Sequence, residues 1–179
     1  FMFDPTWSQG CMGCSFVADH YDRIVVHLAH RDISLVTISK APVAKIEGFR
    51  ARMGWRFPWL SAGGTDFSRD FGVSFTDEEI TSGAATYNFT DRAQGIREQP
   101  GLSVFFKDAG GTIFHTYSTY ARGLERFLTA YEYIDTAPRG RDEAKTGGMG
   151  WLRHHDRYGD AVFVPPWMEK PGITSPVVG

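Results

Sequence analysis

Gly10-Cys11-Met12-Gly13-Cys14-Ser15-Phe16 carries the strongest structural signal in this chain. The stretch holds the only two cysteines among 179 residues, three positions apart. A short apolar segment over residues 1–3 and the turn-forming Asp4-Pro5 pair precede it, and a helical pattern follows it. A strand, a turn, a C-x-x-C pair and a helix in this order predict a redox-active dithiol at the start of a helix.

The residues that follow alternate between expected helices and expected strands. Apolar residues recur at three- and four-residue steps from Cys14 to Leu28, which predicts one amphipathic helix that closes at Arg31-Asp32. The β-branched run over residues 33–39 predicts a buried strand, and residues 43–53 predict a helix that stops at Gly54. A short edge strand over 57–61 and a short helix over 65–71 follow.

The second half is less regular at first. Residues 73–100 contain a capping box that begins at Thr76 and a weak strand signal at 87–89. Residues 102–107 and 112–120 predict a β-hairpin around a turn at 108–111. Apolar positions from Leu124 to Ile134 predict a helix that ends before Pro138.

This order of elements predicts an α/β protein with a thioredoxin-like three-layer fold, in which helices cover both faces of a mixed central sheet. We expect an insertion near residues 73–100. We divide the chain into a thioredoxin-like domain, residues 1–137, and a C-terminal extension, residues 138–179, that packs on the domain or on a partner subunit. The extension ends in an extended arm that contains Pro165, Pro166, Pro171 and Pro176.

Composition narrows the set of partners and locations. The 19 Lys and Arg against 21 Asp and Glu give a net charge of −2, which favours neither nucleic acid nor an anionic membrane surface. No apolar run approaches the roughly 18 residues of a membrane span, and no signal peptide is recognisable. We therefore expect a cytoplasmic protein. Because residue 1 lies inside an expected strand, we also expect a natural segment before it.

The spacing of the two cysteines suits disulfide exchange. Residues i and i+3 of a helix lie about 5–6 Å apart, and a small adjustment brings their Cβ atoms to the ~3.8 Å of a disulfide. The unpaired N–H groups and partial positive charge of a helix start favour a thiolate, so we expect Cys11 to attack and Cys14 to resolve the mixed disulfide. Zinc would need two further ligands. We therefore expect no metal and no cofactor, with purely structural cysteines as the remaining alternative.

Several stretches resemble one bacterial family. They are Phe1-Met2-Phe3-Asp4-Pro5, the 10–16 stretch, Met-Gly-Trp-Arg-Phe-Pro-Trp at 53–59, Asp-Phe-Gly-Val at 70–73, residues 115–123 and Trp-Leu-Arg-His-His-Asp at 151–156. Over nearly its whole length the chain resembles a thioredoxin-like family of unknown function whose members are described as predicted dithiol-disulfide oxidoreductases. The resemblance implies a thioredoxin-like fold and assigns the redox pair to Cys11 and Cys14. Such an enzyme takes a protein or small-molecule disulfide as substrate and a thiol as electron donor.

Three further residues are candidates for substrate binding. Trp7 is expected to cover the sulfurs or dock a partner, with packing under the turn as the alternative. Gly10 and Gly13 are expected to leave room for a bulky partner. Pro100 is the candidate for the cis-proline of thioredoxins, although it lies one residue further from its strand. Thioredoxin resembles Trp-Cys-Gly-Pro-Cys, so the spacer of this chain leaves the direction of electron transfer open.

Two other functions compete with this interpretation. A peroxiredoxin-like thiol peroxidase would use Cys11 as the peroxidatic cysteine, preceded by Pro5, Thr6 and Ser8. Arg122 would then be the activating arginine, or else an exposed arginine at a helix start. A non-catalytic binding or assembly module, which includes a homo-oligomer, is the other alternative.

Polar residues outside the C-x-x-C motif have two interpretations each. Asp19 and Asp22 are expected either to relay protons to the deeper sulfur or to be solvated. The sequence His154-His155-Asp156 is expected either to fold back over the thiols or form a second site, or to be a solvated or interface-packing tail. Trp55 and Trp59 are expected in the core.

Overall fold

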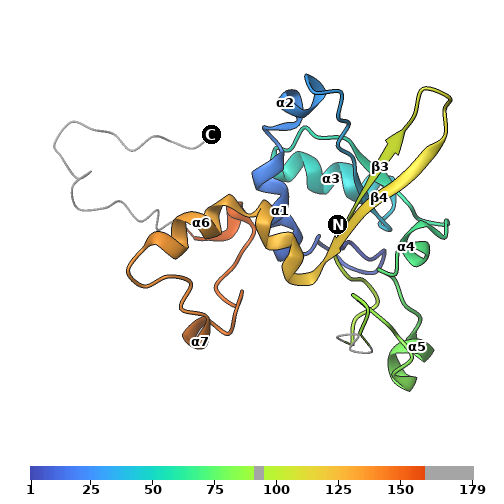
Figure 1. Cartoon of the computed structure of the whole chain (residues 1–179). Helices are drawn as coiled ribbons and strands as arrows, with labels where there is room; N and C mark the ends of the chain where they lie inside the picture. Colours follow the sequence, from blue (N-terminus) through green and yellow to red (C-terminus); the bar gives the residue numbers. More distant parts are fainter. Residues whose placement is uncertain (91–94, 160–179) are drawn as a thin grey trace.

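The computed structural model describes residues 1–90 and 95–159, in which short helices and strands alternate (Figure 1). The mixed α/β content expected from the sequence is confirmed. The expected proline-containing arm, residues 160–179, lies outside the described residues. Within the described ranges, no helix is both long and apolar enough to cross a membrane.

A parallel strand pair with a helical crossover lies at the centre of the first half. Strand β1 (Thr37–Ser39) leads into helix α3 (Val43–Met53) and returns as β2 (Trp59–Ser61), with Thr37 opposite Trp59. Gly54 ends α3 with φ +66°, a left-handed conformation that glycine adopts without steric cost. The predicted helix over 43–53 and its stop at Gly54 are confirmed.

The single helix predicted over Cys14–Leu28 is wrong, because two helices occupy this region. Helix α1 (Met12–Tyr21) ends before Asp22, and α2 (Val25–Ala29) follows a turn. The buried carboxylate of Asp22 accepts hydrogen bonds from the backbone N–H groups of Arg56, at 2.6 Å, and Phe57, at 3.3 Å. This tertiary contact fixes the chain at Asp22. Beyond Asp22 no apolar residue of α2 is fully buried: Val25 still packs against the core, whereas Ile24 and Val26 are exposed.

Two other strand predictions are longer than the strands observed. Of the predicted strand 33–39, only β1 forms, and the residues before it are largely exposed. The strand expected at 87–89 is reduced to a single bridge between Tyr87 and Thr90. In both places β-branched or aromatic composition is present, but no strand within residues 1–90 and 95–159 pairs with these segments in a ladder of hydrogen bonds.

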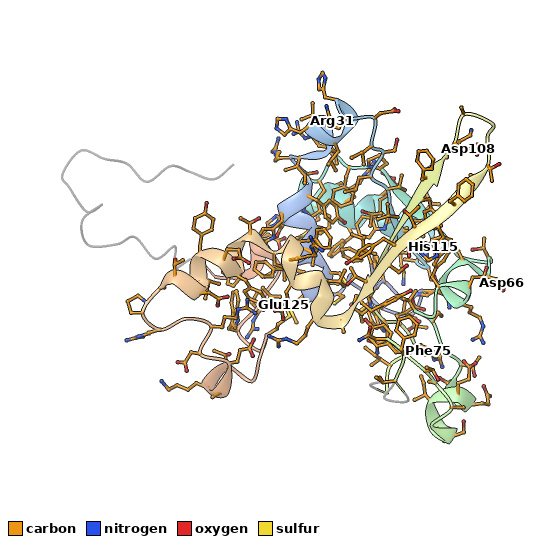
Figure 2. All side chains as sticks on the ribbon, viewed as in Figure 1. Arg31, Asp66, Phe75, Asp108, His115 and Glu125 are labelled. Atoms are coloured by element: carbon orange, nitrogen blue, oxygen red, sulfur yellow. The ribbon has the colours of Figure 1, made fainter. Side chains whose placement is uncertain are left out.

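The predicted single mixed sheet is also wrong for the described residues, because the strands form two separate two-stranded sheets. The hairpin of β3 (Gly101–Lys107) and β4 (Ile113–Tyr120) is confirmed, with an irregularity between Val104 and Phe105. Figure 1 shows this hairpin projecting past α3 and α4, and Figure 2 shows Asp108 near its tip. No hydrogen-bonded ladder within residues 1–90 and 95–159 joins the hairpin to β1 and β2.

The remaining helices are short. Helix α4 (Phe67–Asp70) precedes α5 (Asp77–Ser82), whose predicted capping box between Thr76 and Glu79 is confirmed. The helix predicted over 124–134 starts as a 3-10 helix, η1 (Ala121–Phe127), and becomes α6 (Thr129–Thr136) only after Leu128 leaves helical geometry. The chain then continues through α7 (Glu143–Thr146) and the 3-10 turn η2 (His155–Arg157).

An aromatic core holds α1, α3 and β2 together and supports the cysteine loop. Trp55 and Trp59 lie in it, at 6% and 5% exposure, as expected from the sequence. The buried members of the core are Phe3, Ala18, Ala41, Ile46, Phe49, Met53, Trp55, Phe57 and Trp59. Edge-to-face and tilted ring pairs run through this cluster, and such pairs contribute about 0.5–1.5 kcal/mol each beyond area burial. The loop that carries Cys11 therefore rests on a rigid base.

Candidate functional site

Cys11 is the N-cap residue of α1. Its backbone is extended, with φ −58° and ψ +133°, and its carbonyl accepts the first helical hydrogen bond from the Ser15 N–H at 2.9 Å. Its sulfur accepts from the Cys14 N–H at 3.5 Å. Cys11 is half-buried and Cys14 is buried, and both are free thiols. Cys11 is thus the more accessible of the two thiols, and Cys14 lies one helical turn behind it.

The extended segment Phe1–Phe3 forms hydrogen bonds to both cysteines. The N–H of Cys11 donates to the Met2 carbonyl at 3.0 Å, and the N–H of Met2 donates to the Cys14 sulfur at 3.4 Å. The Phe1 carbonyl in turn accepts from the Ser39 hydroxyl at 2.7 Å, which ties the segment to β1. One short segment therefore fixes the loop, supplies a donor to the deeper sulfur and anchors both to the core.

The two thiols have opposite pKa shifts. The pKa of Cys11 is lowered to about 6, first by a hydrogen bond from the Cys14 thiol and then by the N–H groups of Cys14 and Gly13, against the opposing effect of burial. The pKa of Cys14 is raised, because ionisation would lose its hydrogen bond to Cys11, because it is buried, and because the Cys11 charge is close. When the pair carries one negative charge, that charge lies on Cys11, and the remaining proton lies on Cys14 and is donated to the Cys11 sulfur.

The lowered pKa of Cys11 raises the rate at which its sulfur attacks a disulfide only modestly. It has a larger effect on how readily the same sulfur leaves a mixed disulfide. At pH 7 a thiol of pKa about 6 is about 90% thiolate, against about 3% at the ordinary pKa of 8.5. Intrinsic nucleophilicity falls about 10- to 20-fold over the same shift, so the net gain in attack rate is only about two- to threefold. A low-pKa sulfur also leaves faster from a mixed disulfide. The arrangement suits a cysteine that both forms mixed disulfides and is released from them.

A groove of about 630 Å³ opens beside Cys11. It brings together the loop before α1 and the chain near residue 155, more than 140 positions later. The residues that line it are Trp7, Gln9, Gly10, Cys11, Met12, Arg153, His154 and Arg157. Cys11 therefore lies beside a surface with aromatic, apolar and cationic parts.

The segment 149–157 forms the second wall of this groove. The buried His154 ring lies between two partners: Nε2 is 2.9 Å from the Gly10 carbonyl, and Nδ1 is 2.9 Å from Nη2 of Arg52. Because arginine can only donate, Nδ1 accepts and Nε2 carries the proton that is donated to Gly10. Burial lowers the pKa of His154, which agrees with a neutral ring. Trp151 packs edge-on against Phe16 of α1, with ring centroids 5.9 Å apart.

Of the three predicted substrate-binding residues, Trp7 and Gly10 line the groove beside Cys11 and Pro100 does not. Trp7 packs on the core, as its alternative interpretation expected, and it also lines the groove that contains Cys11; a role in covering the sulfurs or docking a partner stays a prediction. Gly10 lines the groove but is buried, and a Cβ there would lie 2.7 Å from a ring carbon of Phe1. The close approach of Phe1 is a reason for glycine at this position, and room for a partner stays a prediction. At Gly13, by contrast, an added Cβ would meet only ordinary contacts of 3.7 Å or more.

Pro100 lies outside the groove. It precedes β3, its carbonyl accepts from the Tyr87 hydroxyl at 2.7 Å, and it is absent from the groove lining. No peptide bond in the described part of the chain is cis, so the bond before Pro100 is trans. The comparison with the cis-proline of thioredoxins therefore does not hold for this residue in this structure.

The polar candidates around α1 have structural contacts. Asp19 accepts from the Trp55 indole N–H and lies beside Nδ1 of His155, both at 2.8 Å. Asp22 is buried and binds the 56–57 backbone, so its expected solvation is wrong.

Arg122 pairs with Glu125 at 3.1 Å and lies away from the groove lining. Among residues 1–90 and 95–159, no cluster of three or more His, Cys, Asp or Glu side chains could hold a metal ion.

Sequence reasoning missed the parts of the site that come from distant segments. Met2 acts through its backbone, which no side-chain pattern reveals. Arg153 and Arg157 flank the His154-His155-Asp156 signature that the sequence did single out, but nothing in the sequence relates them to Cys11. The available signal was the alternation of the apolar Leu152, the charged Arg153 and the less polar His154, since such a pattern is typical of an extended segment packed on one face, and the structure buries Leu152 and His154 and exposes Arg153.

Comparison with known proteins places this chain in a bacterial family. The sequence model of the family described as bacterial protein of unknown function (DUF899) matches residues 1–158, and the chain belongs to that family. No curated protein and no solved structure matches the chain. The family carries no assigned activity, so its function has to be argued from the site itself.

Proposed function

We propose that this member of the DUF899 family is a dithiol-disulfide oxidoreductase, with Cys11 as the nucleophile and Cys14 as the resolving thiol. One observation carries the proposal. A half-buried thiol at the N-cap of α1 has a pKa lowered to about 6, and its main stabilising partner is a buried second thiol one turn away. Structural cysteines have no need of such an asymmetry, whereas thiol-disulfide exchange depends on it.

The reaction follows from the placement of the two sulfurs. The Cys11 thiolate attacks one sulfur of a substrate disulfide, forms a mixed disulfide and expels the other half as a thiolate. Cys14 then loses its proton to water and attacks the Cys11 sulfur, which breaks the mixed disulfide and expels the second half. The substrate gains two electrons and takes up two protons as two thiols, and the protein is left with a Cys11–Cys14 disulfide.

The Met2 N–H has a specific part in the second step. It points at the Cys14 sulfur from 3.4 Å and stabilises the negative charge that develops when Cys14 is deprotonated. No carboxylate among the described residues hydrogen-bonds to Cys14, so this amide is the group placed to assist. A protein or low-molecular-weight dithiol that reduces the Cys11–Cys14 disulfide completes the cycle.

A thioredoxin-like arrangement of the first part of the chain, residues 1–61, belongs to the same proposal. The β1–α3–β2 crossover, the extended segment Phe1–Phe3 beside β1, and a C-x-x-C pair at the start of α1 all support it. A cytoplasmic location agrees with a single free thiol pair in place of a disulfide scaffold.

Cysteine-to-serine variants test the function. Reduced protein, freed of excess reductant, is mixed with insulin as the disulfide substrate and no other thiol, and the free thiols and protein mass are measured after a single turnover. We expect wild type to form the intramolecular disulfide, Cys14→Ser to retain a mixed disulfide on Cys11, and Cys11→Ser to be inactive. If both thiols titrate near pH 8.5 and no turnover occurs, the proposal is wrong and a non-catalytic binding or assembly role takes its place.

Hydrogen peroxide separates the peroxidase alternative from this proposal. The activating arginine expected for a peroxidase, Arg122, is engaged with Glu125 and Glu143 at 3.1 and 3.4 Å. We therefore expect Cys11 to react with peroxide no faster than a free thiol of the same pKa. A rate several orders of magnitude higher would favour the peroxidase.

A further inference from the structure

We propose that the groove beside Cys11 recognises disulfides that carry a carboxylate near the sulfur, and that Arg153 and Arg157 bind that carboxylate. The proposal rests on the proposed dithiol function and names the substrate class for the same site. It commits to small, acidic disulfides, of the kind formed by cysteine-containing acids and short peptides.

The charge of the groove points to an anionic ligand. No Asp or Glu side chain is found among its lining residues in the described part of the chain. Arg153 is exposed, and its Nη1 donates to the carbonyls of Gly150, at 3.0 Å, and Leu152, at 2.7 Å. These carbonyls orient the guanidinium without neutralising it, and within residues 1–90 and 95–159 no carboxylate forms an ion pair with it.

Arg157 also keeps most of its donors. Its side chain is 60% exposed, and its nearest carboxylate contact among the described residues is from Nε to Asp156 at 3.8 Å. Asp156 lies closer to Arg52, at 3.1 Å. The five N–H groups of a guanidinium form a planar fork that matches a carboxylate with two parallel hydrogen bonds. The groove therefore presents two such forks with few competing partners.

The two arginines are not needed to stabilise the Cys11 thiolate. Its lowered pKa comes from the Cys14 thiol and from backbone N–H groups, and neither arginine is among the main causes. Their charge is therefore available to a ligand. Trp7 and Met12 line the same groove and supply apolar surface for the carbon chain between a carboxylate and a sulfur.

The segment that carries the arginines is firmly held. Leu152 and His154 on either side of Arg153 are 2% and 6% exposed, and His154 is bonded to the Gly10 carbonyl, one residue before Cys11. An extended segment anchored at alternate residues directs the side chain between them outward. The guanidinium of Arg153 is therefore positioned relative to Cys11 by the fold and not by a flexible loop.

Rates of reaction with small disulfides of different charge test the proposal. Reduced protein is mixed in a stopped-flow instrument with 5,5′-dithiobis(2-nitrobenzoate), which carries two carboxylates, with neutral 4,4′-dithiodipyridine, and with cationic cystamine. We expect wild type to prefer the anionic reagent over the cationic one, relative to free N-acetylcysteine, and the preference to shrink at 0.5 M salt. Partly exposed ion pairs predict a loss of about three- to fivefold for each arginine removed.

Matched variants isolate the two arginines from net charge and folding. Arg153→Gln, Arg157→Gln and the double variant should lose rate with the anionic reagent and keep the rate with the neutral one within about twofold. Arg31→Gln makes the same change in charge at an exposed position after α2, labelled in Figure 2, and should leave the ratio of anionic to neutral rates unchanged.

The outcomes separate this inference from the proposed function. If Cys11 reacts faster than N-acetylcysteine with all reagents and the double variant keeps the wild-type ratio, the carboxylate site is refuted and the dithiol function stands. If no reagent reacts faster than with N-acetylcysteine, the dithiol function fails and the inference fails with it. A neutral-reagent rate that also collapses in the double variant would show that the arginines support the fold, and would overturn the binding role.

Discussion

Replacing Cys14 separates the two sources of the Cys11 thiolate, which are the Cys14 thiol and the helix start. The Cys14 thiol is the first cause of the lowered pKa, and the backbone N–H groups of Gly13 and Cys14 remain after the side chain is changed. A hydrogen bond to a charged group contributes about 1.5–3 kcal/mol, and 1.36 kcal/mol corresponds to one pKa unit. We therefore expect Cys14→Ala to raise the pKa of Cys11 from about 6 to about 7–8.

The matched variant Cys14→Ser keeps a hydroxyl donor at the same position. We expect it to leave the pKa of Cys11 closer to 6 than the alanine variant does. Cys11 is then the only thiol, so its pKa can be read from thiolate absorbance at 240 nm and from the pH profile of iodoacetamide alkylation. At pH 7 the thiolate fraction should fall from about 90% to between about 50% and 10% in Cys14→Ala. An unchanged pKa in the alanine variant would refute the reasoning and assign the effect to the helix start.

Three further measurements test other parts of the structure. The potential of the Cys11–Cys14 couple should fall by about 59 mV per pH unit below pH 6 and by about 30 mV above it, because only one proton then accompanies two electrons. Gly10→Ala should destabilise the protein by about 1–3 kcal/mol in urea titrations and Gly13→Ala by much less, since only the first Cβ clashes. Burial lowers the pKa of His154, which lies beside Arg52, Asp156 and Arg157, so the ring takes up a proton when the segment unfolds at low pH. The 149–157 segment should therefore lose protection from hydrogen exchange as the pH falls below about 6.5. The variant His154→Gln should abolish that pH dependence.

The local features of this fold were predictable because they depend on neighbours in sequence. The glycine stop at Gly54, the capping box at Thr76 and the hairpin over 101–120 each follow from a few adjacent residues, and each is confirmed. The position of Cys11 at a helix start follows in the same way from the turn and the apolar period after it. These are the features that turn chemistry and side-chain capping determine.

The features that failed depend on contacts between distant segments. Periodicity continued past Asp22, but its carboxylate binds the backbone at 56–57 and bends the chain. Residues 33–36 and 87–89 have strand-like composition, but the part of the chain that the structure describes offers them no partner strand. The groove beside Cys11 needs Arg153 and His154, which lie more than 140 positions away. A single sequence records which residues are present, but not which of them meet.

The size of the pKa shift of Cys11 limits how far the thiolate alone can change the redox potential of the pair, and with it the direction of electron flow. Lowering the pKa from about 8.5 to about 6 stabilises the reduced form at pH 7 by about 1.4 kcal/mol, which raises the potential by about 30 mV. Thiol-disulfide proteins span about 150 mV, from about −270 to −120 mV. The thiolate therefore accounts for about a fifth of that range. The rest depends on how the oxidised pair fits a loop held by the Met2 backbone on one side and by the His154–Gly10 hydrogen bond on the other. A His154→Gln variant that changes the potential without changing the pKa of Cys11 would identify the C-terminal segment as a determinant of redox direction, whereas an unchanged potential would assign it to substrate binding alone.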